Sequence, residues 1–188
     1  MKIVVIGYAG SGKSTISKSI SQAYDVPLLY LDCVHFLPNW EKRKLEEEIE
    51  IVENFFNEND NWIIDGNYFN VLFEERLEKA DKIVLFNFGR LSCLYRAYKR
   101  SIEYRGKPRE SINPECDEIM DFDFIKHILF DRKKEKEVYD RVAKTYVDKI
   151  SIISNQKELD SLYNELGVKH ENTSNCWYAE WFHWWIFS

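Results

Sequence analysis

The sequence predicts an α/β domain in which a five-stranded parallel sheet lies between layers of helices. Two observations predict this three-layer sandwich. Short apolar runs alternate with segments of helical periodicity five times, and a glycine-rich phosphate-binding loop (P-loop) pattern follows the first run. The expected strands are 2–6, 28–32, 62–66, 82–88 and 148–154. Because parallel strands share a direction, their carboxyl ends meet at one edge, where ligands bind in such sheets.

The P-loop pattern occupies residues 7–14, GYAGSGKS, which match G-x-x-x-x-G-K-S and are followed by Thr15. The strand KIVVI precedes the pattern, and a helix with Ile16, Ile20 and Ala23 on one face follows it. Strand, glycine-rich turn and helix form the context in which this pattern binds phosphate groups.

Each part of the pattern has a role toward a nucleoside triphosphate. The glycines let backbone N–H groups point at phosphate oxygens, and the helix start adds its free N–H groups. Lys13 brings a positive charge to the β- and γ-phosphates, and Ser14 offers a hydroxyl to Mg²⁺. We expect ATP or GTP to bind here with Mg²⁺, and the loop pattern does not distinguish between the two nucleotides. The expected binding residues are Gly7, Ala9, Gly10, Ser11, Gly12, Lys13, Ser14 and Thr15.

Composition and charge limit the possible classes of function. The 188 residues suffice for one domain, and their net charge of −6 offers no global basic surface for DNA or acidic membranes, although a local basic patch stays possible. The chain starts directly with a core strand, so no signal peptide is expected, and no apolar run approaches the ~20 residues of a membrane span. The four scattered cysteines favour a cytosolic protein without disulfides or structural zinc.

Helices are expected between the strands, where apolar residues recur every three or four positions. In the segment 41–59, the acidic run 46–48 is interpreted as the solvated face of an amphipathic helix. The helix 90–105 is expected to have an apolar side made of Leu91, Leu94, Tyr95, Tyr98 and Ile102. The other expected helices are 15–24, 69–80, about 121–145 and 156–167.

Polar residues that follow the strands are candidates for substrate binding. Asp32 ends the second strand, where its carboxylate either orients an acceptor hydroxyl and takes its proton or merely caps a turn. Asp65, Gly66 and Asn67 come just past the apolar part of the third strand and form either a second part of the substrate site or an ordinary turn. Asn87 lies near the end of the fourth strand, where P-loop ATPases carry an acidic Mg²⁺ ligand. An asparagine at this position argues against an ATPase motor.

Arginines after the fourth strand are candidates for stabilising a phosphoryl group in transfer. Arg96 and Arg100 are four positions apart, so they share one face of their helix. Arg105, Arg109 and Arg132 add charge around the Gly- and Pro-rich loop that follows. Such side chains can close over a triphosphate, and the alternative is a solvated basic helix face.

The chain resembles the adenylate-kinase-like P-loop nucleotide kinases, and most closely the bacterial group called "DNA topology modulation protein". Four pieces carry the resemblance over residues 1 to about 150: GYAGSGKST, LYLD with FLPNW, NWIIDGNY, and RLSCLYRAYKRSIEYRGKPR. The resemblance implies a nucleoside-monophosphate-kinase fold with a short lid at about 104–120. It also implies ATP binding at 10–15 and phosphate-facing side chains at Arg96 and Arg100. The group's name suggests a link to DNA supercoiling and gene regulation.

The expected domain, residues 1–168, is followed by a tail at 169–188. The end of the tail, CWYAEWFHWWIFS at 176–188, holds four of the six tryptophans and is too short to span a membrane. It is equally compatible with docking on the domain, with an oligomer interface and with a vestigial extension. The oligomeric state stays open.

Together these predictions describe a cytosolic, Mg²⁺- and ATP-dependent kinase that phosphorylates a nucleotide, nucleoside or similar small acceptor. The alternatives are a nucleotide-binding regulator linked to DNA topology or gene regulation, and a weak NTPase. Direct nucleic-acid binding is not expected of so acidic a chain. The catalytic candidates are Lys13, Arg96, Arg100 and Asp32; the acceptor-binding candidates are Asp32, Asp65, Gly66 and Asn67; and the metal ligand is Ser14.

Overall fold

Five parallel strands form one sheet in the order β2-β3-β1-β4-β5, which confirms the predicted α/β class and all five strands. The structure is a computed structural model that describes residues 1–105, 110–113, 115, 116 and 120–168. The strands are β1 (Lys2–Gly7), β2 (Leu28–Tyr30), β3 (Trp62–Asp65), β4 (Lys82–Phe86) and β5 (Ile150–Ile153).

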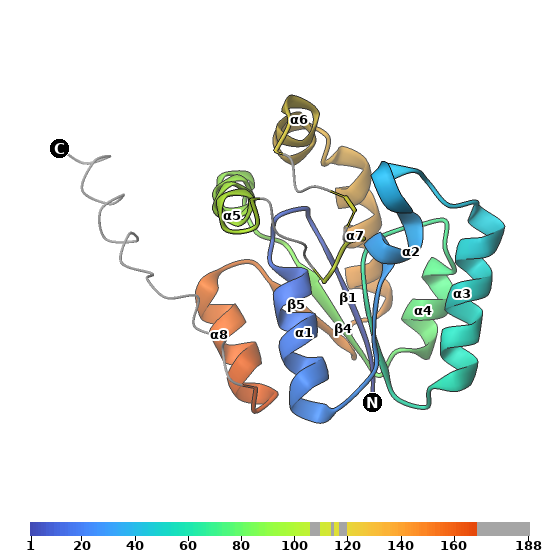
Figure 1. Cartoon of the computed structure of the whole chain (residues 1–188). Helices are drawn as coiled ribbons and strands as arrows, with labels where there is room; N and C mark the ends of the chain where they lie inside the picture. Colours follow the sequence, from blue (N-terminus) through green and yellow to red (C-terminus); the bar gives the residue numbers. More distant parts are fainter. Residues whose placement is uncertain (106–109, 114, 117–119, 169–188) are drawn as a thin grey trace.

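Helices cover both faces of the sheet (Figure 1). On one side lie α1 (Lys13–Tyr24) and α8 (Gln156–Glu165), and on the other lie α3 (Leu45–Glu58), α4 (Phe73–Lys79) and α7 (Lys133–Thr145). Beyond the carboxyl edge of the sheet lie α5 (Arg90–Glu103) and α6 (Phe122–Phe130). Two short elements follow β2: α2 (Leu31–His35) and the 3₁₀ helix η1 (Pro38–Trp40).

The core lies on both faces of the central strands. Residues 3–6 of β1 are completely or almost completely buried, and so are the residues of β3 and most of β4. These strands read as continuous apolar runs because helices cover both of their faces. Ile16 and Ile20 of α1 and Tyr139 and Val142 of α7 complete the core from the two sides.

The helix expected at 121–145 is two helices, α6 and α7, because the chain turns at Asp131 and Arg132. The Arg132 side chain folds inward at this turn, where its Nε donates to the Ile128 carbonyl at 3.0 Å and its Nη1 donates to the Phe88 carbonyl at 2.8 Å. The turn lets α6 pack against α5 while α7 packs against the sheet. Periodicity alone could not show this change of direction.

Two other helices begin later than expected, because the residues before them have other partners. Lys42 forms an antiparallel bridge with Phe36, so α3 begins only at Leu45. The segment 66–72 stays non-helical, with positive φ at Tyr68 (28°) and Leu72 (47°), so α4 begins only at Phe73.

The expected apolar side of α5 is mostly exposed. Leu91, Tyr95, Tyr98 and Ile102 are exposed, and α5 instead turns the small side chains of Cys93 and Ala97 inward. Small inward residues bring the α5 backbone close to the P-loop, as the site geometry shows below. Within the described ranges, no helix has the length and apolar character that crossing a membrane requires.

Candidate phosphoryl-transfer site

The P-loop lies at the carboxyl edge of the central strand, between the end of β1 and the start of α1 (Figure 1). Its backbone requires glycine at three positions, since φ is 140° at Gly7, 73° at Gly10 and 103° at Gly12. A Cβ at Gly7 would lie 2.3 Å from the Phe86 carbonyl oxygen, and one at Gly10 would lie 2.5 Å from the Cys93 carbonyl oxygen. The loop is therefore held tightly between β4 and α5.

The side chains and amides of the loop fit a polyphosphate with Mg²⁺. Lys13 Nζ donates to the carbonyls of Gly7 at 2.9 Å and Tyr8 at 3.0 Å, which holds its charge over the loop. The first N–H groups of α1 have no acceptor within the helix, so they are available to an anion. Ser11 Oγ is completely buried and has no hydrogen-bond partner in the part of the chain that the structure describes. Ser14 is half-buried on the first turn of α1.

Arg96 joins α5 to the loop. Its Nη1 donates to the Ser11 carbonyl at 3.0 Å, its Nη2 donates to Gln156 Oε1 at 3.1 Å, and its guanidinium carbon lies 4.0 Å from the centre of the Phe88 ring. Arg100 lies one helical turn further along α5 and is half-buried. Arg96 is thus joined to the loop by a hydrogen bond, as expected of a side chain that faces phosphate.

Arg132 also contacts the loop, from the turn between α6 and α7. Its guanidinium carbon lies 3.9 Å from the centre of the Tyr8 ring, which belongs to the loop. Its Nη2 is buried without a hydrogen-bond partner among the described residues, so the group keeps an unused donor. Arg105 is exposed, and Arg109 lies outside the described residues. Lys13, Arg96 and Arg132 together give the loop a cationic surround.

Asn67 fixes the start of the loop. Its Oδ1 accepts from the Gly7 N–H at 3.0 Å, and its Nδ2 donates to the Gly7 carbonyl at 3.1 Å and to Glu135 Oε1 at 3.3 Å. The amide expected to bind the acceptor thus has all its hydrogen bonds within the protein. Its contact with Glu135 couples α7 to the P-loop.

Glu135 is a half-buried acid that sequence analysis did not single out. Burial raises the pKa of its carboxyl, while the charges of His127, Lys13 and Arg132 and the bond from Asn67 act in the opposite direction. The sequence carries no signal for this residue, because it lies within the expected continuous helix 121–145. Its position depends on the turn that separates α6 from α7.

The acidic half of the site lies beside the loop, on β3 and α2. Asp65 pairs in register with Val5 of β1 and is buried, so it is the acid at the carboxyl edge next to the P-loop strand. Sequence analysis sought this acid near Asn87, which is instead exposed after β4, with its N–H donating to the Ile153 carbonyl at 2.8 Å. The sequence pattern does not give the order of the strands in the sheet, so it could not show which acidic residue lies beside β1.

Asp32 lies in the first turn of α2 and does not end β2, which stops at Tyr30. Its Oδ1 accepts from the Tyr68 hydroxyl at 2.8 Å. Burial, followed by the charge and hydrogen bond of Asp32, raises the pKa of Tyr68, and the charges of Glu48 and Asp65 act in the same direction. The Tyr68 hydroxyl therefore lies in a negatively charged environment, in contrast to the cationic surround of the loop.

Glu48 is buried and does not lie on the solvated face that the acidic run 46–48 suggested. Its Oε1 lies 2.7 Å from His35 Nδ1, so this pair joins α3 to α2. The His35 ring lies 4.8 Å from Tyr68, and Trp40 lies 5.0 Å from Phe36. These rings line the acidic half of the site with aromatic surface.

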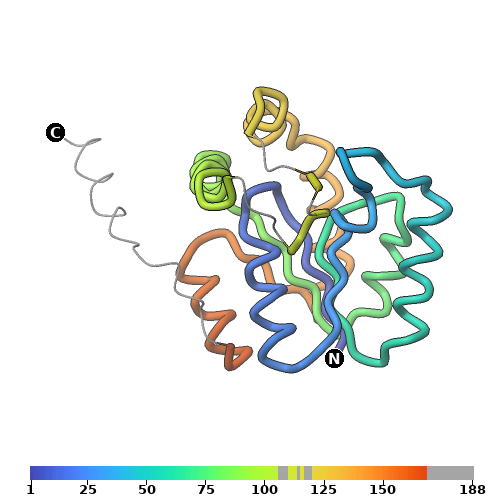
Figure 2. The backbone as a smooth tube through the Cα atoms, viewed as in Figure 1, coloured from blue at the N-terminus to red at the C-terminus, as the bar shows by residue number. Residues whose placement is uncertain are grey.

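The described residues of the segment 104–120 pass over this edge (Figure 2). Glu110 pairs with Lys18 of α1 at 3.0 Å, and its carbonyl accepts from Cys33 Sγ at 3.5 Å. Cys116 Sγ donates to the Leu37 carbonyl at 3.3 Å. Residues 106–109, 114 and 117–119 of the expected lid lie outside the described residues.

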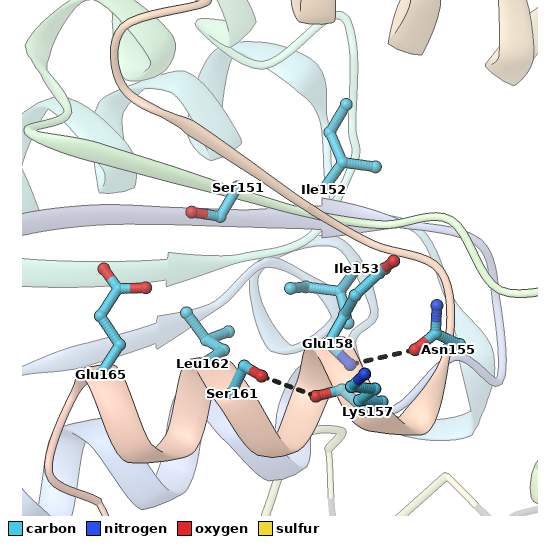
Figure 3. Close-up of a pocket in the computed structure, with 9 residues that line it drawn as sticks. All are labelled: Ser151, Ile152, Ile153, Asn155, Lys157, Glu158, Ser161, Leu162 and Glu165. Carbon is cyan, nitrogen blue, oxygen red and sulfur yellow. Dashed lines mark hydrogen bonds between the residues drawn. The ribbon is translucent and has the colours of Figure 1, made fainter.

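A shallow hollow elsewhere on the surface does not belong to this site (Figure 3). It lies between the edge strand β5 and α8, where Ile152 and Leu162 contribute apolar surface and Glu158 and Glu165 contribute acids. Lys157 is its one basic lining residue, so this hollow lacks the cationic character that a triphosphate requires.

Comparison with solved structures supports the fold. An uncharacterized protein from Eubacterium ventriosum ATCC 27560 aligns with a TM-score of 0.50 and 17% identity, covering 89% of this chain and 99% of the other. Deoxyadenosine kinase from M. mycoides aligns with TM-scores of 0.49, in a structure with products dCMP and a flexible dCDP, and 0.45, in one with dCTP. Both alignments have 14% identity and the same coverage.

The chain has a P-loop α/β fold, with a five-stranded parallel sheet covered by helices on both faces. At these identities the likeness concerns the fold alone. No model of a known protein family matches the chain, and no curated protein sequence matches it.

Proposed function

We propose that this protein is a Mg²⁺- and ATP-dependent kinase that transfers the γ-phosphoryl group to a nucleotide, nucleoside or similar small acceptor. One observation carries the proposal: a cationic loop and an acidic, aromatic-lined rim lie at the same edge of the sheet, linked by the hydrogen bonds between Asn67 and Gly7. The cationic loop suits the phosphates of the donor, and the acidic rim suits the hydroxyl groups of an acceptor. A site that only bound a nucleotide would have no use for the rim.

The loop side would hold the donor. The amides of residues 10–15 and Lys13 would bind the β- and γ-phosphates, and Arg96 would stabilise the charge that develops as the phosphoryl group moves. Ser14 would hold Mg²⁺, which supplies charge neutralisation when bound. No group of three or more His, Cys, Asp or Glu side chains among the described residues is arranged as a metal site, so the phosphates would supply most of the other ligands.

The rim side would hold the acceptor. Asp32 keeps one carboxylate oxygen beyond the bond from Tyr68, and it would orient the acceptor hydroxyl and take its proton. Asp65 and Gly66 would border the same space from β3. The segment 104–120 would act as the lid, since its described residues already contact α1 and α2 across this edge.

The acceptor class rests on the resemblance to nucleotide kinases. The name "DNA topology modulation protein" also suggests a link to DNA topology. We propose that any such link does not involve direct DNA binding, since the net charge of the chain is −6. A nucleotide-binding regulator would use the same loop without transferring phosphate. A weak NTPase would transfer it to water.

A screen of acceptors tests the proposal. ATP consumption by the full chain is measured with Mg²⁺ against a panel of nucleosides and nucleoside monophosphates, with Lys13→Ala as the matched control. At least one acceptor should accelerate consumption, and Lys13→Ala should lower that turnover by ~10²-fold or more, as the loss of a charge-stabilising group does elsewhere. The variant should unfold as the wild type does, because both Lys13 hydrogen bonds go to loop carbonyls. Wild-type turnover in the variant would show that the loop is not the phosphate site.

A further inference from the structure

A stripe of large apolar side chains runs along the outer face of α5. Leu91 is 78% exposed, Tyr95 58%, Tyr98 55% and Ile102 58%. Their spacing of four, three and four residues places them on one face of the helix. The inward face of the same helix carries Cys93 and Ala97 and delivers Arg96 to the P-loop.

The size of this α5 stripe helps to choose its occupant. The four residues expose about 500 Å² together, if a large side chain presents roughly 200 Å². That is near the upper end of apolar patches on monomeric proteins, so the stripe calls for a partner. Two copies pairing through it alone would bury about 1,000 Å², which is only the lower limit of a specific interface. A tethered segment needs less area, because its effective concentration is in the millimolar range.

The chain contains such a segment in residues 176–188, which lie outside the described residues. Eight of these thirteen residues are Trp, Phe, Tyr or Ile, and the only acidic or basic side chains are Glu180 and His183. Leaving so many aromatic groups in water is costly, since burying one side chain of this kind stabilises by about 1.5–3 kcal/mol. A surface rich in exposed Tyr and Leu is a chemically matched place for them.

The chain is also long enough to bring the two together. The bond from Arg96 to Gln156 places the start of α8 beside α5. From Gln156 to Val168 the chain covers about 18 Å if it advances as a helix does. The seven residues 169–175 can then span up to ~23 Å. Residues 169–175 can therefore retrace the length of α8, and the segment 176–188 itself would cover the remaining distance to the outer face of α5.

We propose that residues 176–188 dock on the outer face of α5 that is formed by Leu91, Tyr95, Tyr98 and Ile102. The docked tail covers the helix from the side opposite the P-loop. This docking is independent of the kinase proposal, because the α5 stripe lies on the face of the helix that points away from the P-loop.

Disulfide trapping in the full chain tests the docking directly. Cys176 lies at the start of the aromatic segment, so Tyr95→Cys offers it a partner on α5. The matched controls are Val147→Cys, an exposed apolar position after α7, and Ile152→Cys, which is exposed beside the β5–α8 hollow. After mild oxidation with diamide, the bond to Cys176 within one chain is measured by non-reducing electrophoresis and peptide mass spectrometry.

Tyr95→Cys should form this bond at least ~10-fold faster than either control, as proximity raises the effective concentration. Equal rates at the three positions, or preference for Ile152→Cys, would overturn the proposal. A bond that forms chiefly between chains would also overturn it, because the occupant would then be a second copy.

Tryptophan emission gives a second readout, since four of the six tryptophans lie in the segment. In the full chain, Leu91→Gln with Tyr98→Gln should shift the emission to longer wavelength and raise acrylamide quenching about twofold, whereas Val147→Gln should change neither. Unchanged MgATP affinity in all variants would show that the fold and the P-loop are intact. An unchanged emission in the double variant would overturn the proposal.

Discussion

Arg96 is the residue through which α5 reaches the P-loop, and it offers a test of transition-state stabilisation. Arg96→Ala should lower kcat by ~10²-fold or more, because its interaction strengthens as charge develops on the phosphoryl group. MgATP binding should weaken much less, since the loop amides and Lys13 remain. Steady-state kinetics with the best acceptor, beside equilibrium MgATP binding, separates the two effects.

Arg96→Lys and Arg100→Ala serve as comparisons. Lysine keeps the charge but loses the planar fork that binds both Ser11 and Gln156, so it should recover only part of the activity. Arg100 was predicted from sequence to act as Arg96 does, and Arg100→Ala tests that prediction in the same assay. If Arg96→Ala weakened MgATP binding as much as it lowered kcat/KM, Arg96 would be a ground-state binding residue.

Glu135 gives a prediction for the pH dependence of stability. Its pKa is raised in the fold above the ordinary 4.5, chiefly by burial, so the folded protein holds this proton more tightly than the unfolded chain does. Its contribution to stability is therefore full below the ordinary pKa and is lost as pH rises through the folded pKa. Glu135→Gln keeps an oxygen that accepts from Asn67 and removes the charge.

The variant should match the wild type in acid and should be more stable at neutral pH. Urea unfolding of both proteins across this range measures the difference. A variant that is less stable at neutral pH would show that attraction to Lys13, Arg132 and His127 outweighs the cost of burying the carboxylate.

At the scale of elements, the segment between β3 and α4 is held by Arg76, which is completely buried. Its Nε donates to Val71, its Nη1 to Gly66, and its Nη2 to both Asn67 and Tyr68, all at backbone carbonyls within 2.8–3.1 Å. Burial lowers the pKa of Arg76 to about 9, so it stays charged at neutral pH. This arginine positions both Asn67, which holds the loop, and Tyr68, which holds Asp32.

Arg76→Ala should destabilise the protein by about 3–5 kcal/mol, because it leaves four carbonyls in buried or part-buried hydrogen bonds without their donor. Arg76→Lys, which keeps the charge but cannot reach all four carbonyls, should recover part of the loss. Urea unfolding measures both. A loss below about 1 kcal/mol for the alanine variant would mean that water or neighbouring groups replace the arginine.

The elements differ in how well the sequence predicted them. The P-loop and the five strands depend on local patterns, such as fixed glycine spacing and β-branched runs, and these survive in any tertiary context. Arg76, Arg132 and Glu135 act through partners distant in the sequence, and no local pattern contains that information. The α5 stripe shows a further limit, since periodicity identified an apolar face correctly but could not tell which way it points.

At the scale of the whole molecule, strand order decides which residues meet. The order β2-β3-β1-β4-β5 places β1 between β3 and β4, so the loop after β1 lies beside Asp65 and beneath α5. This arrangement places the cationic loop and the acidic rim side by side at one edge of the sheet. We propose that this placement serves transfer of a phosphoryl group from a nucleotide on the loop to an acceptor on the rim.

The destination of the γ-phosphoryl group tests that claim most directly. The full chain is incubated with Mg²⁺, γ-labelled ATP and the acceptor panel, and the label is followed by chromatography. We predict that it moves to an acceptor, and that Lys13→Ala stops this movement. Label that appears only as inorganic phosphate would identify a weak NTPase. Label that stays on ATP while the protein binds the nucleotide would identify a regulator, and either result would contradict the kinase proposal.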